Sequence, residues 1–213
     1  MPVETFTGPY LTLGGLARYL NASPSERRPV LAKLKKDRLK PGRKFDPHAK
    51  FYTAIRNDLI AGDSFAHVRQ VHLEAPQHHA PSYIALAAGW EKYLCEHPAS
   101  SRQRLARVRN ARVERQGLIV NVNPRFGIAW SHKHVDVVSL WLDQQPLSEH
   151  AGLTIAALMQ SKMRSLCLGG TSTVVDVRRS CAFEAHDDQD LLCAFDSEAA
   201  TVVDLWDTDP AAA

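Results

Sequence analysis

The sequence predicts an α+β protein, with a helical N-terminal region followed by a mixed β-sheet domain. Two observations support this class. Apolar residues recur at helical spacing through most of the first 100 residues, whereas after residue 100 they alternate in twos and are rich in Val, Ile and Trp. The chain has 213 residues, of which 45% are hydrophobic and 23% are charged, so it can bury a sizeable core.

Three helices are expected in the N-terminal region. Residues 12–20 place leucines on one face, and Ser23 begins the N-terminal signature of a second helix. Pro29 lies past the first turn of that helix, where it should kink or delay it. Residues 49–61 carry a third apolar stripe. The Pro- and His-rich residues 74–81 are expected to connect a basic helical region, 1–73, to an α+β sheet domain, 82–213.

The sheet domain is expected to contain a helix, a three-stranded antiparallel meander, a helix, two strands and a helix. The first helix covers residues 82–97. The three strands of the meander are residues 111–124, 125–132 and 134–143, joined by short hairpin connections. A buried helix then runs to Gly169-Gly170, and residues 172–186 form the strand pair. Residues 188–207 make a last helix that is acidic outside and apolar inside.

The net charge of +3 conceals an uneven charge distribution. Residues 26–50 hold ten Lys or Arg against three acids, and residues 102–115 hold six Arg against Glu114. No basic residue follows Arg179, while nine acidic residues do. This layout indicates a polyanion-binding face, although solvated helix faces would give the same pattern.

We therefore expect a nucleic-acid-associated protein, without catalysis of its own, that binds the phosphate backbone of DNA or RNA. The side chains expected to contact phosphates are Arg27, Arg28, Lys33, Lys35, Lys36, Arg43, Lys44, Arg102, Arg104, Arg107 and Arg109. The alternative is an interaction or regulatory subunit. In that case the acidic C-terminal helix would contact a basic protein or the N-terminal face of another copy in a homo-oligomer.

A second alternative, a metal-dependent hydrolase, depends on the sequence HKHVD at residues 132–136. On a strand, His132, His134 and Asp136 share one face and could ligate zinc or iron, so a divalent metal is the one cofactor considered. The stretch resembles the first half of the metallo-β-lactamase signature HxHxDH, but Val137 stands where that family has a second histidine. The polar end of a β-strand explains the same residues without a metal.

Residues 13–34, two helices joined by a short turn, resemble the first part of a helix-turn-helix motif. That resemblance implies a second helix that presents its cations to DNA. They are Arg27, Arg28, Lys33 and Lys35. A plain helical hairpin fits the sequence equally well.

The element order of residues 82–177 resembles that of PD-(D/E)XK nuclease-like domains, whose core is helix, three strands, helix, strand. In that family an aspartate and a Glu-x-Lys on adjacent strands bind magnesium. This chain has Asp136, but residues 137–140 read VVSL, without a Glu-x-Lys. The resemblance therefore implies a nuclease-like scaffold with a binding or structural role.

The chain is expected to be cytoplasmic. It has no apolar run of the roughly 18 residues that a membrane helix needs, and its N-terminus lacks the features of a signal peptide. Its four cysteines form no CxxC pair and are expected to be reduced and mostly buried.

Overall fold

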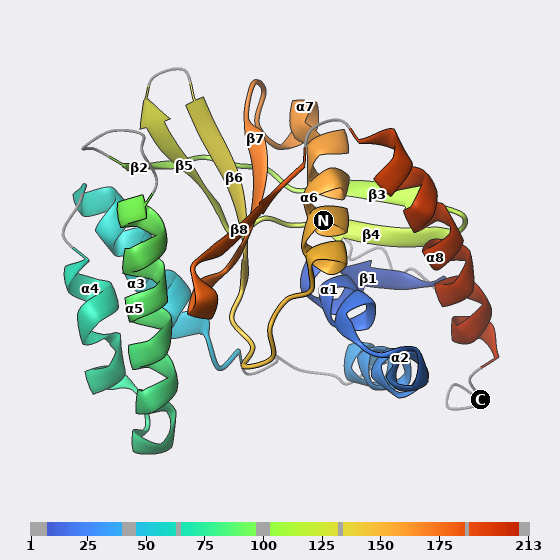
Figure 1. Ribbon diagram of the computed structural model, residues 1–213, viewed down its shortest axis with the longest axis horizontal. Coiled ribbons are helices and arrows are strands. Elements are labelled where there is room, and N and C mark those ends of the chain that lie inside the picture. Colours follow the sequence, from blue (N-terminus) through green and yellow to red (C-terminus); the bar gives the residue numbers. More distant parts are fainter. Residues whose placement is uncertain are drawn as a thin grey trace.

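The structure, a computed structural model, describes residues 8–39, 46–62, 65–96, 103–131, 134–185 and 188–208. Within these residues the chain forms two β-sheets with helices packed around them, which confirms the α+β class (Figure 1). Arg43, Lys44, Arg102 and His132, all expected to be site residues, lie outside the described part of the chain.

The smaller sheet has three strands in the order β1-β4-β3, namely β1 (Tyr10–Thr12), β4 (Leu118–Val122) and β3 (Ala111–Arg115). β3 and β4 form a hairpin whose two turn residues, Gln116 and Gly117, have φ values of 47° and 80°. This is the backbone of a tight two-residue turn. Residues 111–124, expected to be one strand of the meander, are therefore a hairpin. β1, from the N-terminal region, pairs in parallel with β4.

The larger sheet has five strands in the order β2-β5-β6-β7-β8. They are β2 (Arg104–Ala106), β5 (Phe126–Ser131), β6 (His134–Trp141), β7 (Thr171–Asp176) and β8 (Cys181–Glu184). Of the expected meander, the β5–β6 pair is present, but four strands in two sheets, β3 to β6, replace the expected three. β6 and β7 are parallel, and helix α6 (Glu149–Ser161) makes the crossover that a parallel pair requires. β7 and β8 form the expected antiparallel pair.

The five-stranded sheet separates two hydrophobic cores. Neighbouring residues Val137 and Val138 on β6 belong to different cores, as do Val174 and Val175 on β7, because successive side chains point to opposite faces. Such double burial is usual for parallel strands.

The first core contains α6, the smaller sheet, α1 (Leu13–Asn21), α2 (Pro24–Leu39) and α8 (Gln189–Asp207). The second contains α3 (Ala49–Ala61), α4 (Ala66–Gln70) and α5 (Ala80–Glu96), on the other face of the sheet (Figure 1). Short helical turns at Val71–Glu74 and Gln77–His79 cover half of the expected connector, residues 74–81, and lead directly into α5. Residues from before and after the connector contribute to both cores.

The acidic helix α8 packs against the basic helix α2 of the same chain. Arg27 forms a two-pronged ion pair with Glu198, with the shorter contact at 2.8 Å. Lys35 is buried and donates to the Trp206 carbonyl at 2.7 Å, in the last turn of α8, where a cation also suits the helix dipole. α2 continues through Pro29 to Leu39 despite the expected interruption.

Two further sequence-based expectations concern membranes and thiols. No helix among the described residues is long and apolar enough to cross a membrane. The expectation of mostly buried cysteines is wrong: Cys95, Cys181 and Cys193 are exposed, and Cys167 is half-buried. Cys181 lies on an edge strand and Cys193 on α8, so neither position is covered by a neighbouring element.

The α2–α8 ion pair is expected to contribute measurably to folding. A double-mutant cycle on Arg27→Gln and Glu198→Gln should give a coupling energy of about 1–2 kcal/mol in urea unfolding, because both side chains are largely screened from water. The matched control is Arg18–Asp143, a similar pair whose arginine is 56% exposed. Its coupling should stay below about 1 kcal/mol. Equal coupling energies in the two cycles would contradict this reasoning.

Gly89 permits the contact between α5 and the turn after β7. A Cβ at this position would lie 1.9 Å from the Val177 carbonyl oxygen. Gly89→Ala should therefore lower the free energy of unfolding by about 3 kcal/mol, measured by urea titration. Gly14→Ala in α1 is the control, since nothing lies within 4 Å of its Cβ position, and it should be neutral or stabilising. If Gly89→Ala left the free energy of unfolding unchanged, α5 and this turn would be packed less closely than the 1.9 Å Cβ contact implies.

Candidate nucleic-acid interface

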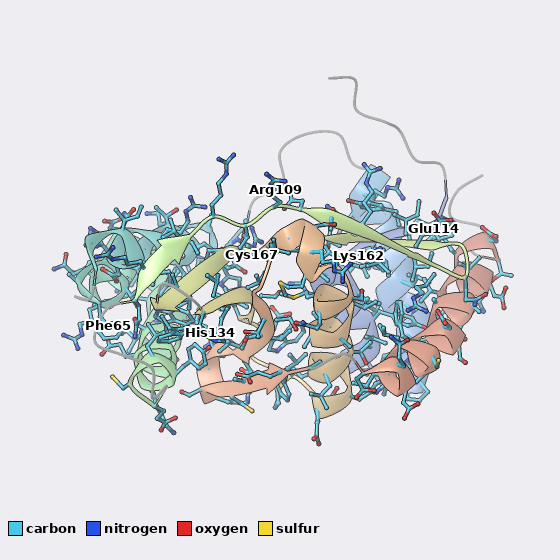
Figure 2. The ribbon with its side chains drawn as sticks, turned by 90° about the horizontal axis from the view of Figure 1, so that it is seen from above. Phe65, Arg109, Glu114, His134, Lys162 and Cys167 are labelled. Atoms are coloured by element: carbon cyan, nitrogen blue, oxygen red, sulfur yellow. The ribbon has the colours of Figure 1, made fainter. Side chains whose placement is uncertain are left out.

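Residues 104–112 form an arginine-rich segment that links the two sheets. Its first part is β2, at the edge of the five-stranded sheet, and the chain then runs into β3 of the three-stranded sheet. Figure 2 shows this segment crossing the molecule, with Arg109 on it. We call residues 104–112 the arginine segment.

Alternation along the arginine segment sorts its side chains into two sets. Leu105 and Val108 are partly buried and pack against the second and first cores, respectively. Val108 also lies against Gly127, where an added Cβ would be 2.9 Å from it. The cations on the segment are exposed: Arg104, Arg107, Arg109 and Arg112. The apolar side chains thus anchor the segment to the sheets and leave its arginines in solvent.

A backbone hydrogen bond adds a second group of cations to the arginine segment. The Arg109 N–H donates to the Leu166 carbonyl at 3.0 Å, which holds the segment against helix α7 (Met163–Leu166). Lys162 and Arg164, half-buried and exposed respectively, precede Leu166 by four and two residues at this helix. The sequence did not single these two residues out, because their local spacing is ordinary for the end of a helix. Only the fold brings them to the arginines.

Five cations of this region are free of acidic partners within the part of the chain that the structure describes. Among the described residues, no side chain pairs with Arg104, Arg107, Arg109, Lys162 or Arg164. We call these five residues the basic surface. Uncompensated positive charge of this kind attracts polyanions, and phosphate groups above all.

The basic stretch of residues 26–50 is arranged differently. Arg27 and Lys35 were expected to face a nucleic acid, yet both turn inward and contact α8. Arg28, Lys33 and Lys36 are exposed on α2. In Figure 1, α2 lies at the opposite end of the view from α7, with β1 and β4 between it and β3. In the helix-turn-helix comparison, therefore, two of the four expected DNA contacts are structural.

The acidic C-terminal helix was the expected contact for a basic partner. Two of its acids already serve the fold, since Glu198 binds Arg27 and Asp196 binds Arg115 at 3.0 Å. Both arginines belong to the same chain. Some of the basic residues at 26–50 and 102–115 are therefore paired with the acidic C-terminal helix of the same molecule.

Asp136, a candidate metal ligand, is enclosed by donors of the protein. It is 2% exposed and accepts hydrogen bonds from the Trp130 indole and, at 2.6 Å, from the Thr171 hydroxyl. His134 Nε2 lies 2.9 Å from Asp136 Oδ1, the oxygen that also accepts from Thr171, and the imidazole is about half exposed. No group of three possible ligands comes together among the described residues. The geometry is that of a buried carboxylate satisfied by its neighbours.

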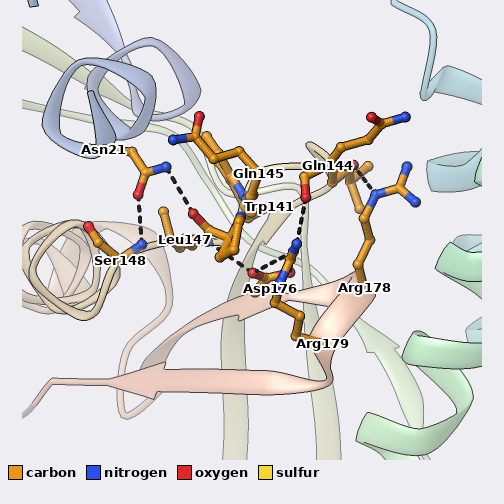
Figure 3. A network of polar contacts seen from close by, with 11 residues as sticks. Asn21, Trp141, Gln144, Gln145, Leu147, Ser148, Asp176, Arg178 and Arg179 are labelled. Atoms are coloured by element: carbon orange, nitrogen blue, oxygen red, sulfur yellow. Dashed lines mark hydrogen bonds and ion pairs between the residues drawn. The ribbon is translucent and has the colours of Figure 1, made fainter. Parts of the chain in front are cut away.

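The opposite end of the β6–β7 pair carries a second enclosed carboxylate (Figure 3). Asp176, 1% exposed, accepts from the Leu147 N–H at 3.0 Å and from the Arg179 guanidinium at 3.2 Å. Arg179 also donates to the Gln144 carbonyl. These contacts hold the loop between β6 and α6.

Asn21 secures the same loop from α1. Its amide donates to the Pro146 carbonyl at 2.9 Å and accepts from the Ser148 N–H at 2.7 Å. Ser148 in turn caps α6. The groups of this network are occupied with one another (Figure 3), so the network serves to position α1 and α6.

Comparison with known proteins gives no information about this interface. No protein-family model matches the chain, and no curated protein matches it significantly.

The two members of the His134–Asp136 pair should differ in their importance to the fold. Asp136→Ala leaves the Trp130 and Thr171 donors unpaired in the interior and should cost about 2–4 kcal/mol in urea unfolding. His134→Ala, at a half-exposed position, should cost less than about 1 kcal/mol. Metal analysis of the purified protein tests whether this pair instead belongs to a metal site. A metal that is retained by the wild type and lost from His134→Ala would establish a metal site here.

Proposed function

We propose that this protein binds the phosphate backbone of a nucleic acid through the basic surface, without catalysis of its own. The observation that carries the proposal is that its five cations have no acidic partner among the residues that the structure describes, while other cations of the chain bind carboxylates or carbonyls. Such unpaired cations, held on rigid elements, lose little when they exchange water for phosphate.

Two features support binding rather than chemistry. Asp136, the carboxylate that the metal hypothesis needs, is occupied by protein donors. On the same strand, residues 137–140 read VVSL, where the PD-(D/E)XK nucleases that residues 82–177 resemble carry a Glu-x-Lys. These residues supply no lysine to position a water and no second carboxylate to hold magnesium.

Removing the three arginines of the basic surface should weaken binding selectively. Arg104, Arg107 and Arg109 changed together to Ala should reduce affinity for a labelled 20-base-pair duplex by roughly tenfold or more at low salt. The slope of log K against log salt should become shallower by about 2–3, since about 0.9 counterion is released per phosphate contact. Fluorescence polarisation across a salt series measures both quantities.

The matched control removes the same charge from α2, as Arg28, Lys33 and Lys36 changed to Ala. These three side chains are exposed, like the arginines, so the two triple variants should keep wild-type stability. The α2 variant should bind more tightly than the arginine variant. Equal weakening in both would mean that net charge alone governs binding and would contradict the assignment to the basic surface. Changing Lys162 and Arg164 to Ala in the arginine variant should weaken binding further.

A further inference from the structure

Proteins that bind single-stranded nucleic acid combine cations with aromatic rings on which bases stack. The basic surface has the cations alone. Neither residues 103–117 nor residues 162–170 contain a Phe, Tyr or Trp. An unpaired base leaving the backbone would therefore meet aliphatic or charged side chains here.

The Phe, Tyr and Trp rings elsewhere in the described chain are buried or partly buried. Ten are buried: Tyr19, Phe51, Tyr83, Trp90, Tyr93, Phe126, Trp130, Trp141, Phe195 and Trp206. Four are partly exposed: Tyr10, Tyr52, Phe65 and Phe183. Phe6 and Phe45 lie outside the described residues.

Three of the four partly exposed rings are covered by a guanidinium of the same chain. Arg38 lies 4.8 Å from the centroid of Tyr10, and Arg125 lies 4.1 Å from that of Tyr52. Arg69 lies 5.8 Å from the centroid of Phe65.

The fourth ring, Phe183, packs against α6. An added Cβ at Gly152 would be 2.4 Å from its Cγ. No Phe, Tyr or Trp among the described residues is therefore fully exposed.

The shape of the arginine segment points the same way. Its ends lie in strands β2 and β3, and the four residues between them run from one sheet to the other (Figure 2). A fully extended chain of eight residue steps spans about 26 Å at about 3.3 Å per residue, which is the upper bound on its length. A DNA duplex rises about 3.4 Å per base pair, so this length corresponds to about eight base pairs, most of one helical turn. Because both ends of the segment belong to sheets, its cations form a fixed row.

A fixed row of cations suits a polymer that is itself stiff. Duplex DNA has a persistence length of about 150 base pairs, so its phosphates are already ordered before binding. A single strand would have to be ordered on the protein, without stacking energy to offset that cost.

We infer that the polymer bound by the basic surface is a nucleic-acid duplex, held by its phosphate backbone, and not a single strand. This inference rests on the proposed function and adds the class of polymer to it. DNA and RNA duplexes share the paired, regularly spaced phosphates that the argument uses.

The test compares four fluorescein-labelled polymers by polarisation with the full chain at one low salt concentration. They are a 20-base-pair DNA duplex, a 20-base-pair RNA duplex, (dT)20 and (U)20. At least one duplex should bind at least about tenfold more tightly than either single strand, and an unlabelled duplex of the same sequence should compete for the site. In the Arg104, Arg107 and Arg109 triple alanine variant this preference should shrink toward equality. An 8-base-pair duplex should retain most of the contacts of the longer one.

Two failures would be told apart by the same measurement. Single strands that bind as tightly as both duplexes, or more tightly, would overturn the inference and leave the phosphate-binding function in place. No salt-dependent binding to any of the four polymers would overturn the proposed function itself. A difference between the two duplexes would support the inference and identify the DNA or RNA form as the ligand.

Discussion

The parallel pairing of β6 with β7, over six residue pairs, constrains the rest of the structure. Two parallel neighbours need a long crossover, and α6 supplies it on one face of the sheet. Parallel strands are apolar on both faces, so the second face must also be covered, and α3 and α5 cover it. The first face then receives α1, α8 and the smaller sheet around α6. The two-core architecture follows from this one pairing.

The ends of the same pair explain why the most enzyme-like residues of the sequence are structural. The register pairs Asp136 with Thr171 at one end and Trp141 with Asp176 at the other. Each aspartate is almost fully buried, and an unpaired carboxylate there would be costly, so each is surrounded by donors. Polar strand ends inside a doubly covered sheet thus become anchors for loops and neighbouring strands.

The positively charged side chains of this protein fall into two groups, those that bind other elements of the fold and those that lie on its surface. Arg27, Lys35 and Arg115 are used between elements, where each meets a carboxylate or a helix end on α8. Among the described residues, Arg104, Arg107 and Arg109 have no such neighbour, because the arginine segment crosses between the two sheets and its apolar side chains face the two cores. Positive charge therefore accumulates on an outer surface as a result of topology, and Lys162 and Arg164 join it through α7.

Local pattern in the sequence determined the α+β class, most of the helices and strand pairs, and the exposure of the arginines at 104, 107 and 109, because periodicity and turn residues act over a few positions. It could not determine that Gln116-Gly117 folds one expected strand into the β3–β4 hairpin of a separate sheet, since that sheet also needs β1 from the N-terminal region to pair with β4. It also could not separate Arg27 from Arg28, which are adjacent in the chain. Arg27 meets Glu198 across 171 positions, and only the packing of α2 on α8 makes one arginine part of the fold and leaves the other in solvent.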